Sequence, residues 1–111
     1  MKPIRSKAFT DAANGTDCIR CSDSHAYACH YNGIRQHKYG KAMRQKCTDL
    51  MTAEFCKHCD DMFSEGVPLL FYDGSRACTE EERSEEFQHW INMTNIRRLE
   101  RGDLIMKGVK I

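Results

Sequence analysis

The strongest periodic pattern of hydrophobic and polar positions covers residues 80–101, in the last third of the chain. At helical spacing this segment carries Phe87, Trp90, Ile91, Thr94 and either Arg98 or Leu99. Thr79 followed by Glu82 has the form of a capping box, in which each side chain accepts a hydrogen bond from the other residue's backbone. Gly102, directly after the run, is typical of a helix end. These signals predict a helix over residues 80–101.

The rest of the chain has weaker local patterns. We expect a short helix over residues 9–14 ending at Gly15, an irregular or extended segment over 24–33, one or two helical turns over 60–64 ending at Gly66, and a short strand over 103–107. Gly40 interrupts any helix within residues 34–46. No internal repeat or low-complexity linker divides the sequence, so one domain over residues 1–111 is the simplest organisation.

The composition is that of a globular chain rather than a disordered one, with 41% hydrophobic and 30% charged residues over 111 positions. A chain of this length buries a modest fraction of its surface, so any cross-link or bound metal that holds the core together matters. No stretch approaches the roughly 20 apolar residues that a membrane helix needs. The basic N-terminal arm, residues 1–8, has no apolar signal core behind its charges. We therefore expect a cytoplasmic protein with no membrane partner.

Seven cysteines are a high count for a chain of this length. The number is odd, no secretion signal is evident, and a reducing cytosol keeps thiols free. Cysteine pairs at ligand spacing therefore favour a bound metal over disulfides. Cys29, Cys47 and Cys78 have no partner at such spacing, and we expect them to serve as small apolar side chains.

The chain contains two Cys-x2-Cys pairs, Cys18 with Cys21 and Cys56 with Cys59. Two intervening residues let both sulfurs of a pair face one ion from a tight turn, and tetrahedral zinc takes four such ligands at about 2.3 Å. We predict one structural Zn²⁺ bound by these four cysteines, with residues 22–55 forming a lobe between the pairs. The alternatives are buried thiols or a redox pair, or His58 as a ligand in place of a cysteine.

The formal net charge of +1 conceals an asymmetry between the two halves of the chain. Residues 1–47 carry nine Lys/Arg against three Asp/Glu, whereas residues 48–111 carry eight against thirteen. The basic lobe, residues 34–46, contains no acid and holds Arg35, Lys38, Lys41, Arg44 and Lys46. Such a cluster, with tyrosines nearby to stack on bases, favours a nucleic-acid partner; the alternative is a solvated surface loop. We expect the acidic residues 80–86 to point away from the nucleic-acid face.

Four short motifs give the chain a resemblance to a known family. They are DAANGTDC at residues 11–18, ACH at 28–30, KCTDL at 46–50 and AEFCKHCD at 53–60, with weaker likeness around Trp90 and over 104–108. In these motifs and their order the sequence resembles the His-Asn-His (HNH) endonucleases, and more closely the small nucleases of lambda-like bacteriophages and prophages. The resemblance implies an α+β fold in which zinc holds a hairpin and a helix together, the ββα-metal motif, followed by a C-terminal helix and a short strand.

The resemblance also implies roles for individual residues. In that family a histidine activates water, an Asn or Asp orients it, and a divalent ion lies at the scissile phosphate; the matching positions are His30 as general base and Asp49 as orienting residue. Asp60 stands where the family usually has a histidine, and Cys29 where many members have Asp or His. Asp60 could still hold Mg²⁺ or Mn²⁺, whereas Cys29 is a poor ligand for Mg²⁺. Each residue also has a purely structural alternative. His30 could be a hydrogen-bonded core residue, Asp49 a turn residue and Asp60 a helix cap.

Two functions follow from this reading. The first is a metal-dependent endonuclease that hydrolyses phosphodiester bonds in DNA through His30, Asp49 and Asp60. The second is a catalytically degenerate, zinc-binding accessory protein that binds nucleic acid or a host protein. Cleavage of DNA that depends on His30 distinguishes the first function from the second.

Overall fold

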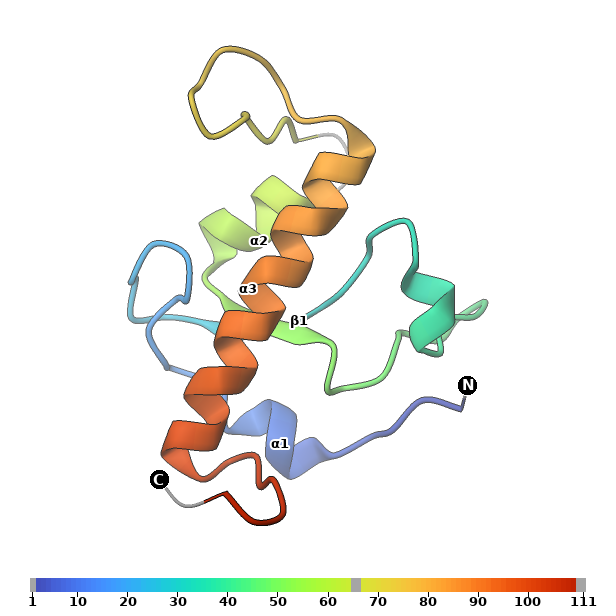
Figure 1. The fold of residues 1–111 in the computed structure, drawn as a ribbon, viewed down its shortest axis with the longest axis vertical. Coiled ribbons are helices and arrows are strands. Elements are labelled where there is room, and N and C mark those ends of the chain that lie inside the picture. Colours follow the sequence, from blue (N-terminus) through green and yellow to red (C-terminus); the bar gives the residue numbers. More distant parts are fainter. Residues whose placement is uncertain (1, 65–66, 110–111) are drawn as a thin grey trace.

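The structure is a computed structural model that describes residues 2–64 and 67–109. In chain order, the described residues form α1 (Lys7–Asp11), β1 (Tyr27–His30), the 3-10 helix η1 (Gln36–Tyr39), β2 (Thr52–Phe55), α2 (Lys57–Phe63) and α3 (Glu80–Arg101). Helix α3 is the longest element and lies across the strands, with α1 near its C-terminal end and α2 nearer its N-terminal end (Figure 1). The protein is therefore small and mixed α+β, which confirms the predicted class.

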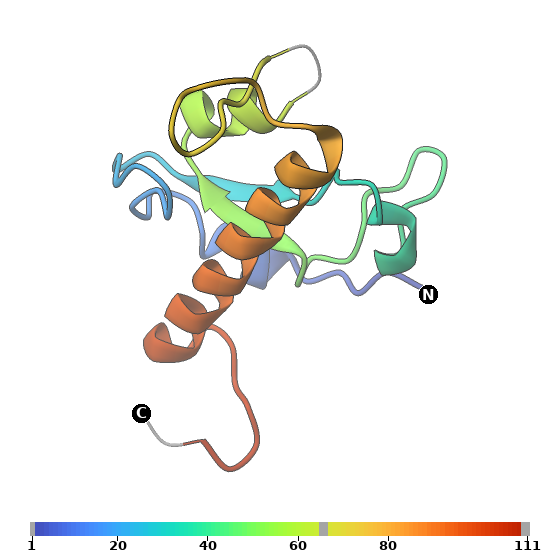
Figure 2. The same ribbon diagram turned by 45° about the horizontal axis from the view of Figure 1, so that its top comes forward.

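The two strands form an antiparallel pair at the centre of the fold. Tyr27 is opposite Phe55, and His30 is opposite Thr52. All four residues of β2 are buried, because α3 packs against this strand and β1 lies beside it (Figure 2). Residues 24–33, predicted to be irregular or extended, contain β1 and its irregular flanks.

Helix α1 differs from the predicted short helix over residues 9–14. It begins at Lys7 and ends at Asp11, because Ser6 caps it: the Ser6 side chain accepts a hydrogen bond from the Phe9 backbone N–H at 3.2 Å. Turns follow the helix as far as Gly15, whose φ of +80° is one that glycine tolerates. The predicted start was therefore wrong by two residues, and the helix ends before Gly15.

The N-terminal arm lies against the segment that precedes β2. The Ile4 N–H donates to Thr48 Oγ1 at 2.8 Å, and the Asp49 N–H donates to the Ile4 carbonyl at 2.9 Å. Pro3 contacts Gly40, where a Cβ atom would come within 3.0 Å of the Pro3 Cβ. Gly40 ends η1 with a φ of +94°, so the predicted helix break at this glycine is confirmed. The arm thereby fastens the basic lobe to the sheet.

Helix α3 has the predicted bounds. Thr79 and Glu82 form the reciprocal capping box, and Gly102 ends the helix in the left-handed conformation. The face that packs inward carries Phe87, Ile91 and Thr94, all of them buried. Phe87 lies 5.3 Å from Phe55 of β2, centroid to centroid, so the aromatic core joins the helix to the strand.

A buried ionic network also joins α3 to β2. Glu54 is fully buried, and its two carboxylate oxygens accept hydrogen bonds from Arg97 at 2.6 Å and from Arg101 at 2.7 Å. These bonds outweigh burial and lower the pKa of the Glu54 carboxyl. Arg98, also buried, donates to the carbonyl and hydroxyl of Thr52. The polar residues at these positions of the helix are therefore part of its packed face.

Two other sequence-based expectations need correction. Residues 103–107 do not form a strand; the N–H groups of Asp103 and Leu104 bond back to the Arg98 carbonyl, and Ile105 is 87% exposed with no neighbouring strand among the described residues. Helix α2 begins at Lys57, earlier than the predicted turns over 60–64, because Cys56 serves as its N-cap. Its predicted end at Gly66 lies outside the described residues. No helix in the described part of the chain is long and apolar enough to cross a membrane.

Candidate metal centre and His30 cavity

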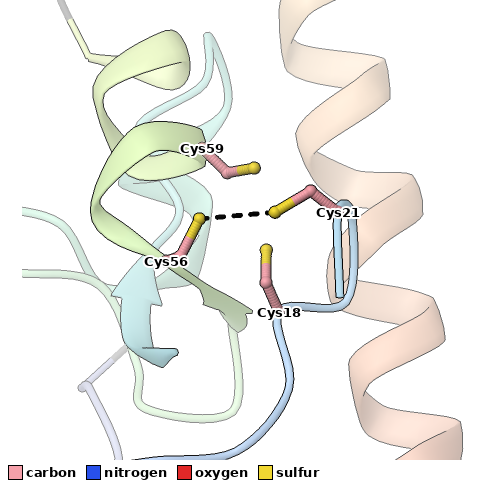
Figure 3. A group of neighbouring side chains, drawn as sticks. All are labelled: Cys18, Cys21, Cys56 and Cys59. Carbon is pink, nitrogen blue, oxygen red and sulfur yellow. Dashed lines mark hydrogen bonds between the residues drawn. The ribbon is translucent and has the colours of Figure 1, made fainter. Parts of the chain in front are cut away.

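Two turns bring the predicted zinc ligands together. Cys18 and Cys21 lie in a tight turn in which the Ser22 N–H donates to the Cys18 carbonyl at 2.9 Å, and Ser22 adopts a left-handed φ of 70°. Cys56 is the N-cap of α2, and Cys59 lies in the first turn of that helix. Figure 3 shows the four side chains converging from these two segments. The sequence spacing therefore predicted this convergence correctly.

The geometry of the cluster suits a tetrahedral metal site. The four Sγ atoms all lie within 4.8 Å of one another, and the Sγ atoms of Cys21 and Cys56 are 3.5 Å apart. With zinc–sulfur bonds of about 2.3 Å, the sulfurs of a tetrahedral site are about 3.8 Å apart. Three of the cysteines are buried and Cys21 is exposed. The cluster could hold a metal ion and is compatible with structural zinc, whereas His58 is exposed and lies outside it.

The electrostatics of the cluster also favour a cation. Burial opposes ionisation of Cys18, but backbone hydrogen bonds, chiefly at Cys56, lower the pKa of its thiol to about 7. Burial raises the pKa of Cys59, and the neighbouring thiols add to this effect, although Arg20 Nη1 approaches the Cys59 sulfur at 3.6 Å. Several thiolates side by side are therefore unfavourable unless a cation lies between them. A bound Zn²⁺ would supply that charge.

His30 lies at the end of β1, beside the segment that leads into β2. Its Nε2–H donates to Asp49 Oδ1 at 2.8 Å, because an ionised carboxylate can only accept a hydrogen bond. Nδ1 is then the nitrogen that carries a lone pair, and it makes no hydrogen bond with residues 2–64 or 67–109. Burial lowers the pKa of His30 below its ordinary 6.5, and the bond to Asp49 offsets this only in part. The imidazole is therefore neutral near pH 7.

The N-terminal arm holds Asp49 in place. Arg5 Nη1 donates to Asp49 Oδ1 at 3.0 Å, and the Ser6 N–H donates to Oδ2 at 2.7 Å. The Arg5 guanidinium also donates to two neighbouring backbone carbonyls. Burial alone would raise the pKa of Asp49, but the bonds from His30, Ser6 and Arg5 lower it. Asp49 is therefore a fixed carboxylate that orients the His30 ring.

A cavity of about 270 Å³ opens beside His30. Its lining includes Tyr27, Cys29, His30, Lys41, Lys46 and Asp60. The Tyr27 hydroxyl donates to Asp60 Oδ2 at 2.6 Å. Burial and the nearby Asp60 carboxylate raise the pKa of the Cys29 thiol, so Cys29 stays protonated. The structure thus brings the predicted base and the predicted acidic residue of α2 to one cavity.

His30 also lines a second depression, together with Arg5, Arg44, Gln45, Lys46 and Asp49. Three of the five predicted cations of the basic lobe therefore adjoin His30 through one depression or the other. Arg35 and Lys38 are exposed on the lobe and line neither. The acidic residues 80–86 line neither depression, and their predicted orientation relative to a nucleic acid stays a prediction.

Sequence reasoning missed Arg5 and Tyr27. Arg5 reaches Asp49 only because the N-terminal arm folds back along residues 47–49, and no spacing rule connects positions so far apart. Tyr27 lies in no motif that distinguishes it from the other aromatic residues of the sequence. A signal existed for Arg5 alone, because it belongs to the predicted basic arm of residues 1–8, but the arm was given no partner in the rest of the chain.

A catalytic Mg²⁺ or Mn²⁺ fits the described residues poorly. Among residues 2–64 and 67–109, the four cysteines are the only group of three or more His, Cys, Asp and Glu side chains close enough to share an ion. Asp60 offers a single carboxylate that already accepts the Tyr27 hydroxyl. Mg²⁺ usually takes one or two carboxylates and fills its other positions with water or phosphate oxygens. The protein by itself therefore does not form a closed site for this ion.

No family model, curated protein or solved structure gives a significant match. The fold and the cysteine cluster define it as a small mixed α+β protein with a candidate metal centre.

Proposed function

We propose that the protein is a zinc-stapled endonuclease that hydrolyses phosphodiester bonds in DNA, with His30 as general base. The main support is the position of His30, which lines a cavity with Asp60 and two lysines while Asp49 holds its ring. The order strand, strand, helix, with the cysteine cluster at the start of the helix, is also what the HNH resemblance implies.

The residues around His30 suit proton abstraction from water. The Asp49 carboxylate binds Nε2–H and so keeps the lone pair on Nδ1. Nδ1 takes a proton from water as the water oxygen forms a bond to phosphorus, the bond from phosphorus to the leaving oxygen breaks, and that oxygen takes a proton from solvent. Because burial lowers the pKa of His30, the base is in its reactive neutral form at neutral pH.

The cations around His30 suit a phosphodiester backbone. Lys41 and Lys46 line the cavity, and Arg44 and Lys46 line the adjoining depression. Lysine and arginine side chains neutralise phosphates and release condensed counterions, so they supply most of the affinity for DNA irrespective of its sequence. A DNA strand crossing His30 would place phosphates against both depressions.

The decisive experiment is cleavage of plasmid DNA in the presence of Mg²⁺ or Mn²⁺. We expect the wild type to cleave and His30→Ala to reduce the rate by at least about 100-fold, the usual contribution of a general base. His25→Ala is the matched control, because His25 is exposed and bonds only to Asp23 and Ser24 among the described residues. If the wild type and His30→Ala leave plasmid equally intact, the enzyme proposal fails.

The second candidate is a zinc-binding accessory protein that binds nucleic acid, or a host protein, without cleaving DNA. One observation favours it. Asp60 accepts a hydrogen bond from Tyr27, and the described residues near it do not form a group of three potential ligands for a divalent ion. Salt-dependent DNA binding that persists without cleavage, and weakens when Lys41 and Arg44 are neutralised, would support it. Lys57→Gln is the control, since Lys57 lies on α2 and bonds Asp61.

A further inference from the structure

A groove of about 770 Å³ lies between α3 and the loop over residues 67–79, and it shares no lining residue with the His30 cavity. The loop extends beyond the start of α3, into which it leads (Figure 1). The helix contributes five side chains at spacings that place them on one stripe: Glu82, Glu85, Glu86, His89 and Trp90. This stripe is distinct from the buried face that packs on β2.

The loop side of the groove is an ordered wall. The Phe71 N–H donates to the Arg76 carbonyl at 2.8 Å, and the Cys78 N–H donates to the Leu69 carbonyl at 2.7 Å, so the loop is a short hairpin. Leu69 is buried and anchors this hairpin. Tyr72, which also lines the groove, is 90% exposed. The groove therefore combines an apolar, aromatic wall with an acidic helix stripe.

One guanidinium of the chain itself already binds at this wall. The Arg76 guanidinium lies 4.2 Å from the Phe71 ring centroid. It also donates two hydrogen bonds to the Glu82 carboxylate, at 2.6 and 2.8 Å. An aromatic face and a bidentate carboxylate are a strong combination for holding a guanidinium. The groove thus displays the chemistry of arginine recognition in an intramolecular contact.

One turn further along α3, Trp90 and Glu86 form a second aromatic–carboxylate pair, and no cation among residues 2–64 and 67–109 is bound to it. Trp90 is half-buried, and its Nε1–H donates to Glu86 Oε1 at 3.0 Å. Glu85 and Glu86 form no ion pair with residues 2–64 or 67–109. Arg20 lines the groove, but its Nη1 points to the sulfurs of Cys59 and Met62. The Trp90–Glu86 pair therefore has the composition of the Phe71–Glu82 pair and carries no cation of the described chain.

We propose that this groove binds a basic segment of a partner protein, with an arginine or lysine side chain against Trp90 and Glu86. The carboxylates repel nucleic acid, so the charge of the groove selects a cationic polypeptide. A second copy of the chain is a poorer occupant. Its basic lobe would have to enter the groove of the first copy, and the N-terminal arm already holds that lobe against its own sheet.

Trp90 is the only tryptophan, so its fluorescence reports on the groove directly. The probe is an arginine-rich peptide with a central leucine, titrated at low salt, and its comparison is the same peptide with citrulline in place of arginine. We expect the arginine peptide to shift the Trp90 emission with saturation, and the citrulline peptide to bind at least about tenfold more weakly. Equal binding of both peptides would overturn the proposal.

Two double variants distinguish specific binding in the groove from general electrostatic attraction to an acidic helix. Glu85→Gln with Glu86→Gln should weaken the arginine peptide about tenfold, whereas Glu80→Gln with Glu81→Gln, at exposed positions outside the groove, should change affinity by less than about threefold. Equal losses in both variants would show diffuse electrostatics and refute the site. Self-association that the groove variant abolishes would assign the groove to a second copy and also refute it. Neither result depends on DNA cleavage.

Discussion

At the scale of single residues, opposing effects set the pKa of His30. Burial lowers the pKa of the imidazole, and Arg5 and Lys46 act in the same direction, while the Asp49 carboxylate raises it. The side chain is 17% exposed, which is enough contact with solvent for proton exchange. The balance keeps the ring neutral yet oriented, as a general base requires.

Two substitutions should therefore shift the pKa of His30 in opposite directions. Asp49→Asn removes the carboxylate that favours the imidazolium, so the pKa should fall further below 6.5. Arg5→Ala removes a cation that disfavours it, so the pKa should rise. NMR titration of the His30 ring protons measures both, and Lys7→Ala is the control, because Lys7 bonds Asp11 instead. Shifts of the same sign in both variants would contradict this account.

The same pKa governs how His30 contributes to stability. Because the pKa is lower in the folded protein than the ordinary 6.5, the unfolded chain binds this proton more readily. The free energy of unfolding should therefore fall as pH drops below about 7, until the lowered pKa is passed. His30→Gln should show a shallower fall in urea unfolding over the same range. Protonation of the cysteine cluster affects both proteins alike, so the difference between them isolates His30.

At the scale of elements, the contact of α3 with β2 depends on charges as much as on apolar packing. Glu54 faces Arg97 and Arg101 from a strand position with no solvent contact. Arg98 fills the adjacent position and lies over the Phe9 ring at 4.3 Å, so α1 is joined to the same network. The polar residues of α3 that would weaken an ordinary hydrophobic stripe are satisfied here by backbone and carboxylate partners.

Removing the Glu54 charge should loosen this contact. Glu54→Gln leaves two arginines without their carboxylate and should lower the free energy of unfolding by about 3 kcal/mol, since a buried charge pair has lost one partner. The arginine side chains keep 27% and 29% exposure, which limits the loss. Glu100→Gln, on the exposed side of α3, should change stability by less than about 0.5 kcal/mol. Equal effects of the two variants in urea unfolding would refute this role.

At the scale of the whole molecule, the cysteine cluster connects the first third of the chain to the strand pair and α2. The sheet formed by the described residues has two strands, and a pair of this size is rarely stable alone in water. A metal bound by both cysteine pairs would close a long loop of chain and contribute its binding energy to folding. The position of the cluster therefore matters to the entire fold.

Loss of the metal should accordingly unfold the protein. Native mass spectrometry should find one Zn²⁺ per chain, and strong chelator should abolish the cooperative thermal transition. Cys56→Ser should behave like the chelated protein, whereas Cys78→Ser, outside the cluster and half-buried, should keep both zinc and a transition near that of the wild type. A metal-free wild type that stays folded in chelator would contradict the structural role of zinc.

The sequence by itself determined the features that depend on neighbours along the chain. The capping box at Thr79, the terminal Gly102 and the spacing of each cysteine pair act within a few residues, so α3 and the two cysteine turns were predictable. Only the tertiary structure decided which distant groups meet. Residues 103–107 are irregular, with no strand beside them in the described part of the chain, and Arg5 reaches Asp49 because the N-terminal arm folds back. Such contacts depend on the path of the whole chain, which local sequence patterns do not determine.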